Sequence, residues 1–466
     1  MTKRRDFIKK SAMGTAGLAI GGLGFSAKSY ASIPGANDRI HMAVIGIRNH
    51  GRHHINRWCR LKESHNVVVT TLCDVDERLF ESRSKIVYDH TGSKPKTEWD
   101  MRKVYDDRDI DAVAIVTPNH WHALATIWAC QAGKHVYVEK PVSHNIFEGR
   151  KMVEAANKYK VHVQHGSSAA VGEAMDFLLD GGIGDVYMAR ALCLHRRNSY
   201  GMAEDSAPPD KFHYDMWLGP ATYRPYNEKR SHYCWHWYWD TGNGDTGNTG
   251  PHTIQQARVG LRKDEHPVLA FSTGGLYGFR QDGRRSPGVM SYGDVETYGD
   301  DPTFQETPNT QTCVFQYSDG KKFVFDTRGR YTNMEGTNNI GNGNLFYGSK
   351  GYMEYSGGWK AFRDWEKEPF AGAGIGASSP ESNAGRPDLY TNFLDVIRSG
   401  RNEDLVNPIL GGHYSAALVH LANISYRLGG RSLRFDGAAE KFIDDPEADA
   451  LLTRDYRAPY IVPDRV

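Results

Sequence analysis

The chain has almost no net charge, few cysteines and no long apolar run, and each absence excludes a class of protein. Its 466 residues carry 57 basic and 56 acidic side chains, so no charge excess indicates nucleic-acid binding. The six cysteines are scattered without a CxxC pair, which argues against a disulfide scaffold or a standard zinc ribbon. No apolar run is long enough for a stable membrane span. With 39% apolar residues, the composition is globular and the length suggests two or three domains.

The N-terminal segment differs in charge from the rest of the chain. Residues 1–31 contain six Lys or Arg and one acid, and they include the sequence Arg4-Arg5-Asp6-Phe7. Small and apolar residues follow from Ala12 to Phe25, and Ser29-Tyr30-Ala31 has the small-x-small pattern of a cleavage site. This order resembles a twin-arginine export signal. It implies a periplasmic protein that is carried folded by the twin-arginine machinery and loses residues 1–31.

After residue 31, the first recognisable pattern in the sequence is that of a strand, a glycine turn and a helix. An apolar run at 40–47 leads into Gly46-Ile47-Arg48-Asn49-His50-Gly51, a helix is expected from Arg52, and a second strand at 66–72 is followed by Asp74. This spacing is typical of dinucleotide binding, with the helix N-terminus facing the pyrophosphate and Asp74 facing the ribose, which favours NAD over NADP. Arg48 stands where the motif has its second glycine, and it could contact phosphate itself.

Further strands are expected at 110–116, 135–138 and 161–164, separated by helices. Strands that alternate with helices indicate a doubly wound parallel sheet, here a Rossmann domain over residues 38–165, and ligands of such a sheet bind at the carboxyl ends of its strands. The predicted cofactor-binding residues are Gly46, Ile47, Arg48, Asn49, His50, Gly51, Asp74, Thr117, Pro118, Asn119, His122, Glu139, Lys140 and Gln164.

Several longer segments carry a family resemblance. They are CDVD around Asp74, DIDAVAIVTPNHWHA, AGKHVYVEKP, GGIGDVYMAR, WDTGNGDTGNTGPH, LFYGSKGYMEY and LYTNFLDVIRSG, and the chain resembles the Gfo/Idh/MocA oxidoreductases. The resemblance implies an α/β protein whose second domain, residues 166–466, is α+β with a large, mostly antiparallel open sheet. It also implies substrate binding and homo-oligomerisation through that domain, with C-terminal helices that pack back on the Rossmann domain.

The resemblance also implies catalytic residues. Lys140, in the Glu139-Lys140-Pro141 turn, would lie between nicotinamide and sugar and polarise the reacting oxygen. His252 would be the proton acceptor. Asn248 stands where the family has an aspartate, and an amide can hold a substrate hydroxyl but supplies no charge to His252. Asp245, about one helical turn earlier, is the alternative source of that charge.

The second domain departs from the family in a loop and contains an unusual aromatic segment. Residues 166–170 read Gly-Ser-Ser-Ala-Ala instead of Gly-x-Gln-x-Arg, so this loop predicts no substrate contact. The segment 232–240, HYCWHWYWD, could stack on sugar faces, pack a domain interface or bind a metal through His232, Cys234, His236 and Asp240. No second motif completes a zinc pattern, so no metal site is predicted. The predicted substrate-binding residues are His195, Tyr200, Trp235, His236, Trp237 and Arg328.

These observations predict an exported NAD-dependent oxidoreductase that acts on a ring hydroxyl of a sugar or glycoside. Because an exported protein has no free nicotinamide pool, we expect the cofactor to be tightly bound. One alternative is an NAD-dependent glycosidase that oxidises C3 transiently and eliminates the aglycone, with an extra base near C2 drawn from Tyr200, Tyr214, His195 or His236. Another is a non-catalytic sugar-binding protein, which Arg48 and Asn248 favour but Lys140 and His252 disfavour.

Overall fold

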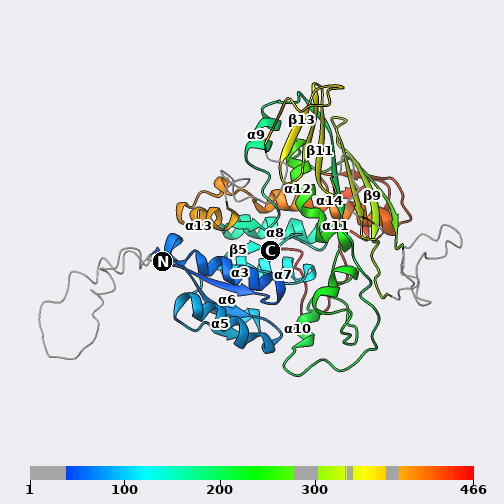
Figure 1. The fold of residues 1–466 in the computed structure, drawn as a ribbon. Helices are drawn as coiled ribbons and strands as arrows, with labels where there is room; N and C mark the ends of the chain where they lie inside the picture. The colour runs from blue at the N-terminus through cyan, green and yellow to red at the C-terminus, as the bar shows by residue number, and fades with distance from the viewer. Residues whose placement is uncertain (1–37, 278–302, 331, 333–339, 374–387) are drawn as a thin grey trace, which may run out of the picture. The chain divides into compact units, whose positions relative to one another are not determined.

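The computed structural model describes residues 38–277, 303–330, 332, 340–373 and 388–466 (Figure 1). Residues Ile40–Val466 form one compact unit. The expected export signal at 1–31 lies outside the described residues. Within the described ranges, every helix is too short or too polar to cross a membrane.

Six parallel strands form the first sheet, in the order β3-β2-β1-β4-β5-β6 (Figure 1). Successive side chains of the central strand β1 point to opposite faces, so Met42 and Val44 pack with helices α3 and α5 while Ala43 and Ile45 pack with α6, α7 and α8. Helices on both faces make the sheet doubly wound, which confirms the predicted fold class. The elements are β1 (Ile40–Ile45), α3 (Asn49–Arg60), α4 (Lys62–His65), β2 (Val67–Cys73), η2 (Glu77–Leu79), α5 (Phe80–Thr91), β3 (Lys96–Glu98), α6 (Met101–Asp106), β4 (Ala112–Ile115), α7 (Asn119–Gln131), β5 (His135–Val138), α8 (Ile146–Tyr159) and β6 (Val163–His165).

The second sheet has ten strands in the order β14-β13-β12-β11-β7-β10-β9-β8-β15-β16. Only β7 and β10 pair in parallel, so the sheet is mostly antiparallel, as the resemblance implied. Helices α9, α12 and α14 share one hydrophobic core with its strands. The strands are β7 (Val186–Leu194), β8 (Leu269–Gly275), β9 (Thr310–Gln316), β10 (Lys322–Arg328), β11 (Asn342–Gly348), β12 (Gly351–Tyr355), β13 (Trp359–Phe362), β14 (Ala371–Ala373), β15 (Leu433–Asp436) and β16 (Lys441–Phe442).

Helices that follow the first sheet in sequence contact both sheets. The apolar residues Phe393 and Leu394 of α13 pack with β1 and α3, and α14 packs on the second sheet and against α8. The helices after the first sheet are α9 (Glu173–Leu179), α10 (Tyr214–Leu218), η3 (His232–Trp237), α11 (Gly244–Asn248), α12 (Gly250–Gly260), α13 (Leu389–Ser399), η6 (Asn402–Asp404), α14 (Ile409–Arg427) and α15 (Pro446–Asp449).

The aromatic segment folds as the 3-10 helix η3, and this corrects one reading of it. A strand would have placed His232, Cys234 and His236 on one side, but three residues per turn separate positions two apart. Positions three apart are neighbours instead, which brings Trp235 to the side of His232. The segment presents the rings of His232, Tyr233, Trp235 and His236 to one cavity.

Candidate cofactor crevice and active site

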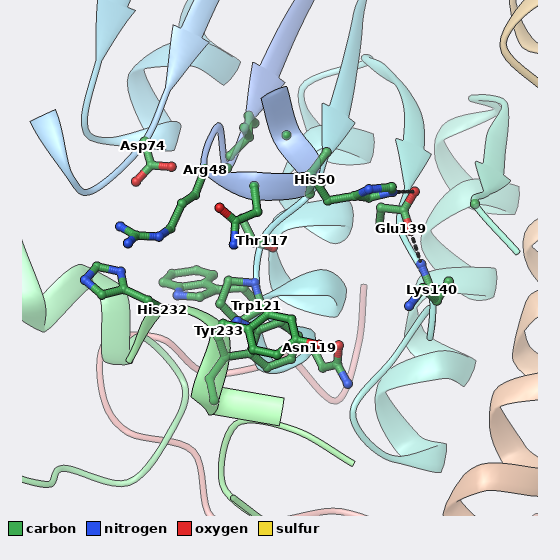
Figure 2. A pocket seen from close by; sticks show the side chains of 18 of the residues that line it. Arg48, His50, Asp74, Thr117, Asn119, Trp121, Glu139, Lys140, His232 and Tyr233 are labelled. Carbon is green, nitrogen blue, oxygen red and sulfur yellow. Dashed lines mark hydrogen bonds and ion pairs between the residues drawn. The ribbon is translucent and has the colours of Figure 1, made fainter. Parts of the chain in front are cut away.

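A cavity of about 590 Å³, which we call the large cavity, lies at the carboxyl ends of the first sheet's strands (Figure 2). Its walls come from the turns after β1, β2, β4 and β5, from the segment 232–236, and from the starts of α12 and α13. Several elements that are far apart in sequence converge on this cavity. Each predicted site residue can therefore be tested by whether it lines the cavity.

The glycine turn is shaped as a phosphate cradle requires. Gly46 has φ of +85°, and a Cβ there would lie 2.6 Å from the carbonyl oxygen of Val116. A Cβ on Gly51 would lie 1.9 Å from the carbonyl oxygen of Gly46, so no larger residue fits without moving backbone. Helix α3 begins at Asn49 without a side-chain cap, and its first turn lines the large cavity. Uncapped N–H groups at a helix start are suited to an anion.

Asp74 is held at the end of β2 by the backbone. Its Oδ2 accepts the N–H of Ile47 at 2.8 Å, and its Oδ1 accepts the N–H of Asp76 at 2.9 Å. Each oxygen keeps a further lone pair for a hydroxyl of a ligand. Burial, opposed by these backbone bonds, raises the pKa of Asp74 to about 6.

Arg48 is directed toward the Asp76 carboxylate, with a separation of 3.5 Å. Figure 2 shows its guanidinium between Asp74 and the ring of His232. The arginine that replaces the motif's second glycine therefore lies along the wall of the large cavity, where it can reach a bound anion.

The Glu139-Lys140 turn is anchored by the same helix that follows the glycine turn. Glu139 Oε1 interacts with Nε2 of His50 at 3.2 Å and of His54 at 2.9 Å, and its Oε2 accepts the backbone N–H of Lys140 at 3.1 Å. Burial alone would raise the pKa of Glu139, but the two imidazoles outweigh it and hold the pKa well below its usual range. The Glu139 carboxylate thus connects helix α3, which follows the glycine turn, to the backbone of the predicted catalytic lysine.

Lys140, Asn248 and His252 meet in the large cavity. Lys140 Nζ donates to the backbone oxygen of Asn248 at 2.5 Å and lies 3.4 Å from its Oδ1. Burial, opposed by Glu139, lowers the pKa of Lys140. His252 Nδ1 accepts the backbone N–H of Ser168 at 3.0 Å and lies 3.1 Å from its Oγ. Ser168 gave no signal in the sequence, because the loop that carries it does not follow the family pattern.

Asp245 has a different partner from the one expected. Its Oδ1 lies 2.5 Å from Nε of Arg197, both side chains are almost fully buried, and Asp245 does not line the large cavity. Burial, with a further contribution from the ammonium of Lys140, lowers the pKa of His252 to about 3. The sequence missed Arg197, since a single arginine in a variable segment carries no pattern.

Three of the predicted cofactor residues do not line the large cavity. Gln164 donates from Nε2 to the backbone oxygen of Leu389 at 2.6 Å. The two ring nitrogens of His122 lie at hydrogen-bond distance from the carbonyl oxygens of Pro141 and Thr117, at 2.7 and 2.8 Å. Ile47 contributes only its N–H to Asp74. The residues that do line it are Gly46, Arg48, Asn49, His50, Gly51, Asp74, Thr117, Pro118, Asn119, Glu139 and Lys140.

Of the predicted substrate-binding residues, too, some line the large cavity and others do not. Trp235 and His236 line the large cavity, whereas Trp237 is buried and does not line it, and the Tyr200 ring is tilted against the Trp237 ring with 4.4 Å between centroids. His195 is exposed and Arg328 lies on β10, both away from the large cavity. Tyr214, a candidate extra base, donates its hydroxyl to the backbone oxygen of Arg224 instead. Several rings that were not among the predicted cofactor or substrate residues also line the large cavity, namely Trp99, Trp121, Phe212, Trp217, His232 and Tyr233.

A second, small cavity of about 290 Å³ shares Ser168 and His252 with the large one. Among the residues that the structure describes, its lining contains no Asp, Glu, Lys or Arg side chain. Hydroxyl and amide groups surround it, and the buried Oδ1 of Asn342 has no hydrogen-bond partner among the described residues. The lining residues are Ser168, Thr249, His252, Thr253, Gln256, Asn342, Gly343, Tyr355, Ser356 and Gly357.

Two groups among the described residues bring three potential metal ligands together, and neither involves the segment 232–240. One is His50, His54 and Glu139, and the other is His266, His413 and Glu440. In both groups the two imidazoles already hydrogen-bond the carboxylate.

Comparison with known proteins agrees with this geometry. Residues 40–167 match the oxidoreductase family with an NAD-binding Rossmann fold (GFO_IDH_MocA), and residues 199–272 and 309–462 match the family's C-terminal alpha/beta domain. Curated relatives include a glycosyl hydrolase family 109 protein of Shewanella pealeana, 28% identical over 171 residues, and an α-N-acetylgalactosaminidase of Shewanella oneidensis, 24% identical over 172 residues. Each match covers 33% of this chain and 37% of the relative, so only about a third of either length is compared.

Solved structures extend the likeness over most of the chain. The WlbA dehydrogenase of Chromobacterium violaceum, in complex with NADH and UDP-GlcNAcA, has a TM-score of 0.58 at 18% identity and covers 85% of this chain and 97% of its own. A levoglucosan dehydrogenase in complex with NADH and L-sorbose has a TM-score of 0.59 at 15% identity, with 87% and 98% covered. At these identities the likeness concerns the fold. Together with the matched segments, it shows that the chain belongs to the Gfo/Idh/MocA family of oxidoreductases.

Proposed function

We propose that the chain is an NAD-dependent enzyme that oxidises a ring hydroxyl of a sugar or glycoside. The observation that carries this proposal is the convergence of Lys140, Asn248 and His252 on the cavity that also contains the glycine turn and Asp74. When bound there, a nicotinamide supplies a hydride acceptor. Lys140 would stabilise negative charge on the reacting oxygen, and His252 would accept the proton of the hydroxyl group.

The residues present suit a tightly held NAD. The glycine turn and the start of α3 would hold the pyrophosphate, and the two oxygens of Asp74 would accept ribose hydroxyls, which disfavours a 2'-phosphate. Phe212, Trp217 and His232, which follow the first sheet in sequence, also line the large cavity. A dinucleotide enclosed from both sides buries most of its surface and dissociates slowly.

The sugar is uncharged in this proposal, because the described side chains that line the small cavity are hydroxyl and amide groups together with the imidazole of His252, without a carboxylate, ammonium or guanidinium group. Such groups donate to and accept from sugar hydroxyls, whereas a carboxylate or phosphate buried there would have no counter-charge in the lining. The ligands named for the two dehydrogenase structures include both an acidic sugar and a neutral one, so the lining favours the neutral class here.

Mass spectrometry of the purified, denatured protein tests the cofactor. We expect NAD to be recovered in near-stoichiometric amount without having been added. An empty protein that also fails to bind added NAD would overturn the proposal and favour a non-catalytic, sugar-binding role.

An NAD-dependent glycosidase is the second candidate function. The names of the curated relatives favour it, and the same Lys140 and His252 would serve its transient oxidation at C3. Incubation with aryl glycosides in deuterated water separates the two chemistries. Deuterium at C2 of the released sugar requires proton removal and elimination, whereas net oxidation without released aglycone supports the dehydrogenase.

We also propose that the chain is exported to the periplasm by the twin-arginine machinery. The ordered basic, apolar and small-x-small blocks of residues 1–31 support this. Cell fractionation of an Arg4→Lys/Arg5→Lys variant tests it, with retention of the uncleaved variant in the cytoplasm as the expected result. Equal export of both proteins would contradict it.

Homo-oligomerisation through the second domain is proposed from the family resemblance. Sedimentation velocity at several protein concentrations measures the assembled mass directly. A monomer at micromolar concentration would refute the proposal.

A further inference from the structure

A short backbone bridge joins the loop after β2 to the segment that precedes α10. Asp76 and Phe212 pair as an isolated antiparallel bridge. Two backbone hydrogen bonds flank this pair, from the N–H of Glu77 to the oxygen of Lys211 at 3.0 Å and from the N–H of His213 to the oxygen of Val75 at 2.8 Å. We call residues 75–77 together with residues 211–213 the clasp.

Side chains connect the clasp to the first sheet. Nε2 of His213 lies 2.6 Å from Oε1 of Glu77, and the His213 ring stacks on the ring of Trp99 with 4.0 Å between centroids. Trp99 follows directly after β3 and lines the large cavity. The clasp therefore contacts the chain at the carboxyl ends of both β2 and β3.

The clasp borders the part of the large cavity that would hold the adenosine of NAD. Asp74, the expected ligand of the ribose, accepts the backbone N–H of Asp76 at 2.9 Å. Val75, Asp76 and Phe212 all line the large cavity, and Phe212 is buried. A ribose bound to Asp74 would therefore lie next to both strands of the clasp.

The chain is held more firmly after the clasp than before it. In α10, which follows, the backbone oxygen of Met216 accepts Nε1–H of Trp121 at 2.9 Å, and that of Trp217 lies 2.9 Å from Nε2 of His120. Residues 202–209, which precede the clasp and are all described by the structure, form neither helix nor strand. Because two hydrogen bonds of an isolated bridge open at a lower cost in free energy than a ladder within a sheet, the clasp can open while α10 stays in place.

We propose that the clasp is the gate of the cofactor site, and that NAD enters and leaves only when residues 211–213 separate from residues 75–77. This rests on the proposed function, because NAD is its cofactor. The fraction of molecules with an open clasp then sets the rate of NAD release. A clasp that is mostly closed keeps the cofactor inside the protein.

Two substitutions at one position test the proposal. His213→Pro removes the N–H that donates to Val75, and the φ of −78° at residue 213 suits proline. His213→Ala is the matched control, since it removes the imidazole and keeps the N–H. Each protein is loaded with NAD and mixed with an excess of isotope-labelled NAD. Mass spectrometry of the denatured protein then follows the replacement of bound NAD with time.

We expect NAD to leave His213→Pro about 2–10-fold faster than His213→Ala, which is the effect of one backbone hydrogen bond on the fraction of open clasp. Equal rates of release from the two variants would overturn the proposal.

A cross-link tests the same gate within a single protein and decides the question if His213→Pro does not fold. Asp76 and Phe212 share no hydrogen bond with each other, and the Cα atoms of such a pair lie about 4.5 Å apart, within the range that a disulfide spans. In Asp76→Cys/Phe212→Cys loaded with NAD, we expect the exchange to stop on oxidation and to resume on reduction. Wild-type protein treated in the same way controls for the native cysteines. Exchange at the same rate in the cross-linked and the reduced protein would overturn the proposal.

These measurements separate failure of the inference from failure of the proposed function. A protein that retains NAD behind the clasp and oxidises no sugar would leave the gate correct and the function wrong. A protein that oxidises a sugar with bound NAD, but releases NAD at the same rate with the clasp intact, weakened or cross-linked, would refute the inference alone.

Discussion

Replacing Arg197 with methionine should destabilise the protein strongly, because it leaves a buried carboxylate without its counter-charge. Arg197 Nε lies 2.5 Å from Asp245 Oδ1, with side-chain exposures of 10% and 3%. The guanidinium also bonds the Tyr233 hydroxyl and Thr249 Oγ1, each at 3.1 Å. Removing one partner of such a buried pair costs about 3–5 kcal/mol of unfolding free energy, and we expect a loss in that range.

The loss should depend on pH in a definite direction. Burial already raises the pKa of Asp245 against the opposing effect of Arg197, so removal of Arg197 raises it further. The folded carboxyl of the variant then binds a proton more tightly than the unfolded one, whose pKa is about 3.9. Stability is therefore lost as pH rises above the unfolded value, and the loss is complete only above the folded pKa. The variant should lie closer to the wild type at pH 5 than at pH 8.

Urea unfolding at pH 5 and pH 8, followed by circular dichroism, measures both effects. Arg401→Met is the matched control, since the ion pair of Arg401 with Asp404 is exposed and such pairs contribute about 0–1 kcal/mol. Adding Asp245→Asn to Arg197→Met removes the buried charge and should recover part of the loss. A loss below about 1 kcal/mol, or one equal at the two pH values, would refute the reasoning.

Three further predictions concern the large cavity. Lys140→Ala should abolish turnover while NAD stays bound, measured by activity and by mass spectrometry of the denatured protein, and full activity would contradict the assigned role. Affinity for NAD should fall as pH drops through about 6, because a protonated Asp74 accepts fewer hydrogen bonds from the ribose. Calorimetry at pH 7.5 and pH 5 measures this change in affinity. In Asp74→Asn the affinity should depend less on pH. Gly51→Ala should reduce NAD occupancy and lower the melting temperature, since its Cβ would lie 1.9 Å from the carbonyl oxygen of Gly46. A variant with the wild-type melting temperature and the wild-type content of bound NAD would show that the turn tolerates the added carbon.

Local patterns in the sequence were sufficient for the elements that position the site. The strand β1, the glycine turn that follows it and the end of β2 at Asp74 lie within one short stretch of the sequence. Their periodicity and spacing therefore predict a strand, a turn and a strand end directly. The alternating strands and helices in turn predict a parallel sheet whose strand ends meet at one edge. Most of the residues expected there do line the large cavity.

The aromatic segment shows where such patterns fail. Its composition indicated rings for a binding wall, but its conformation depends on contacts with distant parts of the chain, and it folds as a 3-10 helix. Trp235 and His236 consequently face the same cavity as Arg48, while Trp237 is buried and does not line it.

By itself, therefore, the sequence determined the two kinds of sheet, the nucleotide-type turn and the identity of Lys140 and His252 as neighbours of one site. Only the tertiary structure decided their partners. Ser168 meets His252 across 84 positions, and Arg197 meets Asp245 across 48. Hydrogen bonds and ion pairs between such distant residues leave no periodicity in the chain, yet they decide which nitrogen of an imidazole carries its proton and which carboxylate is already neutralised.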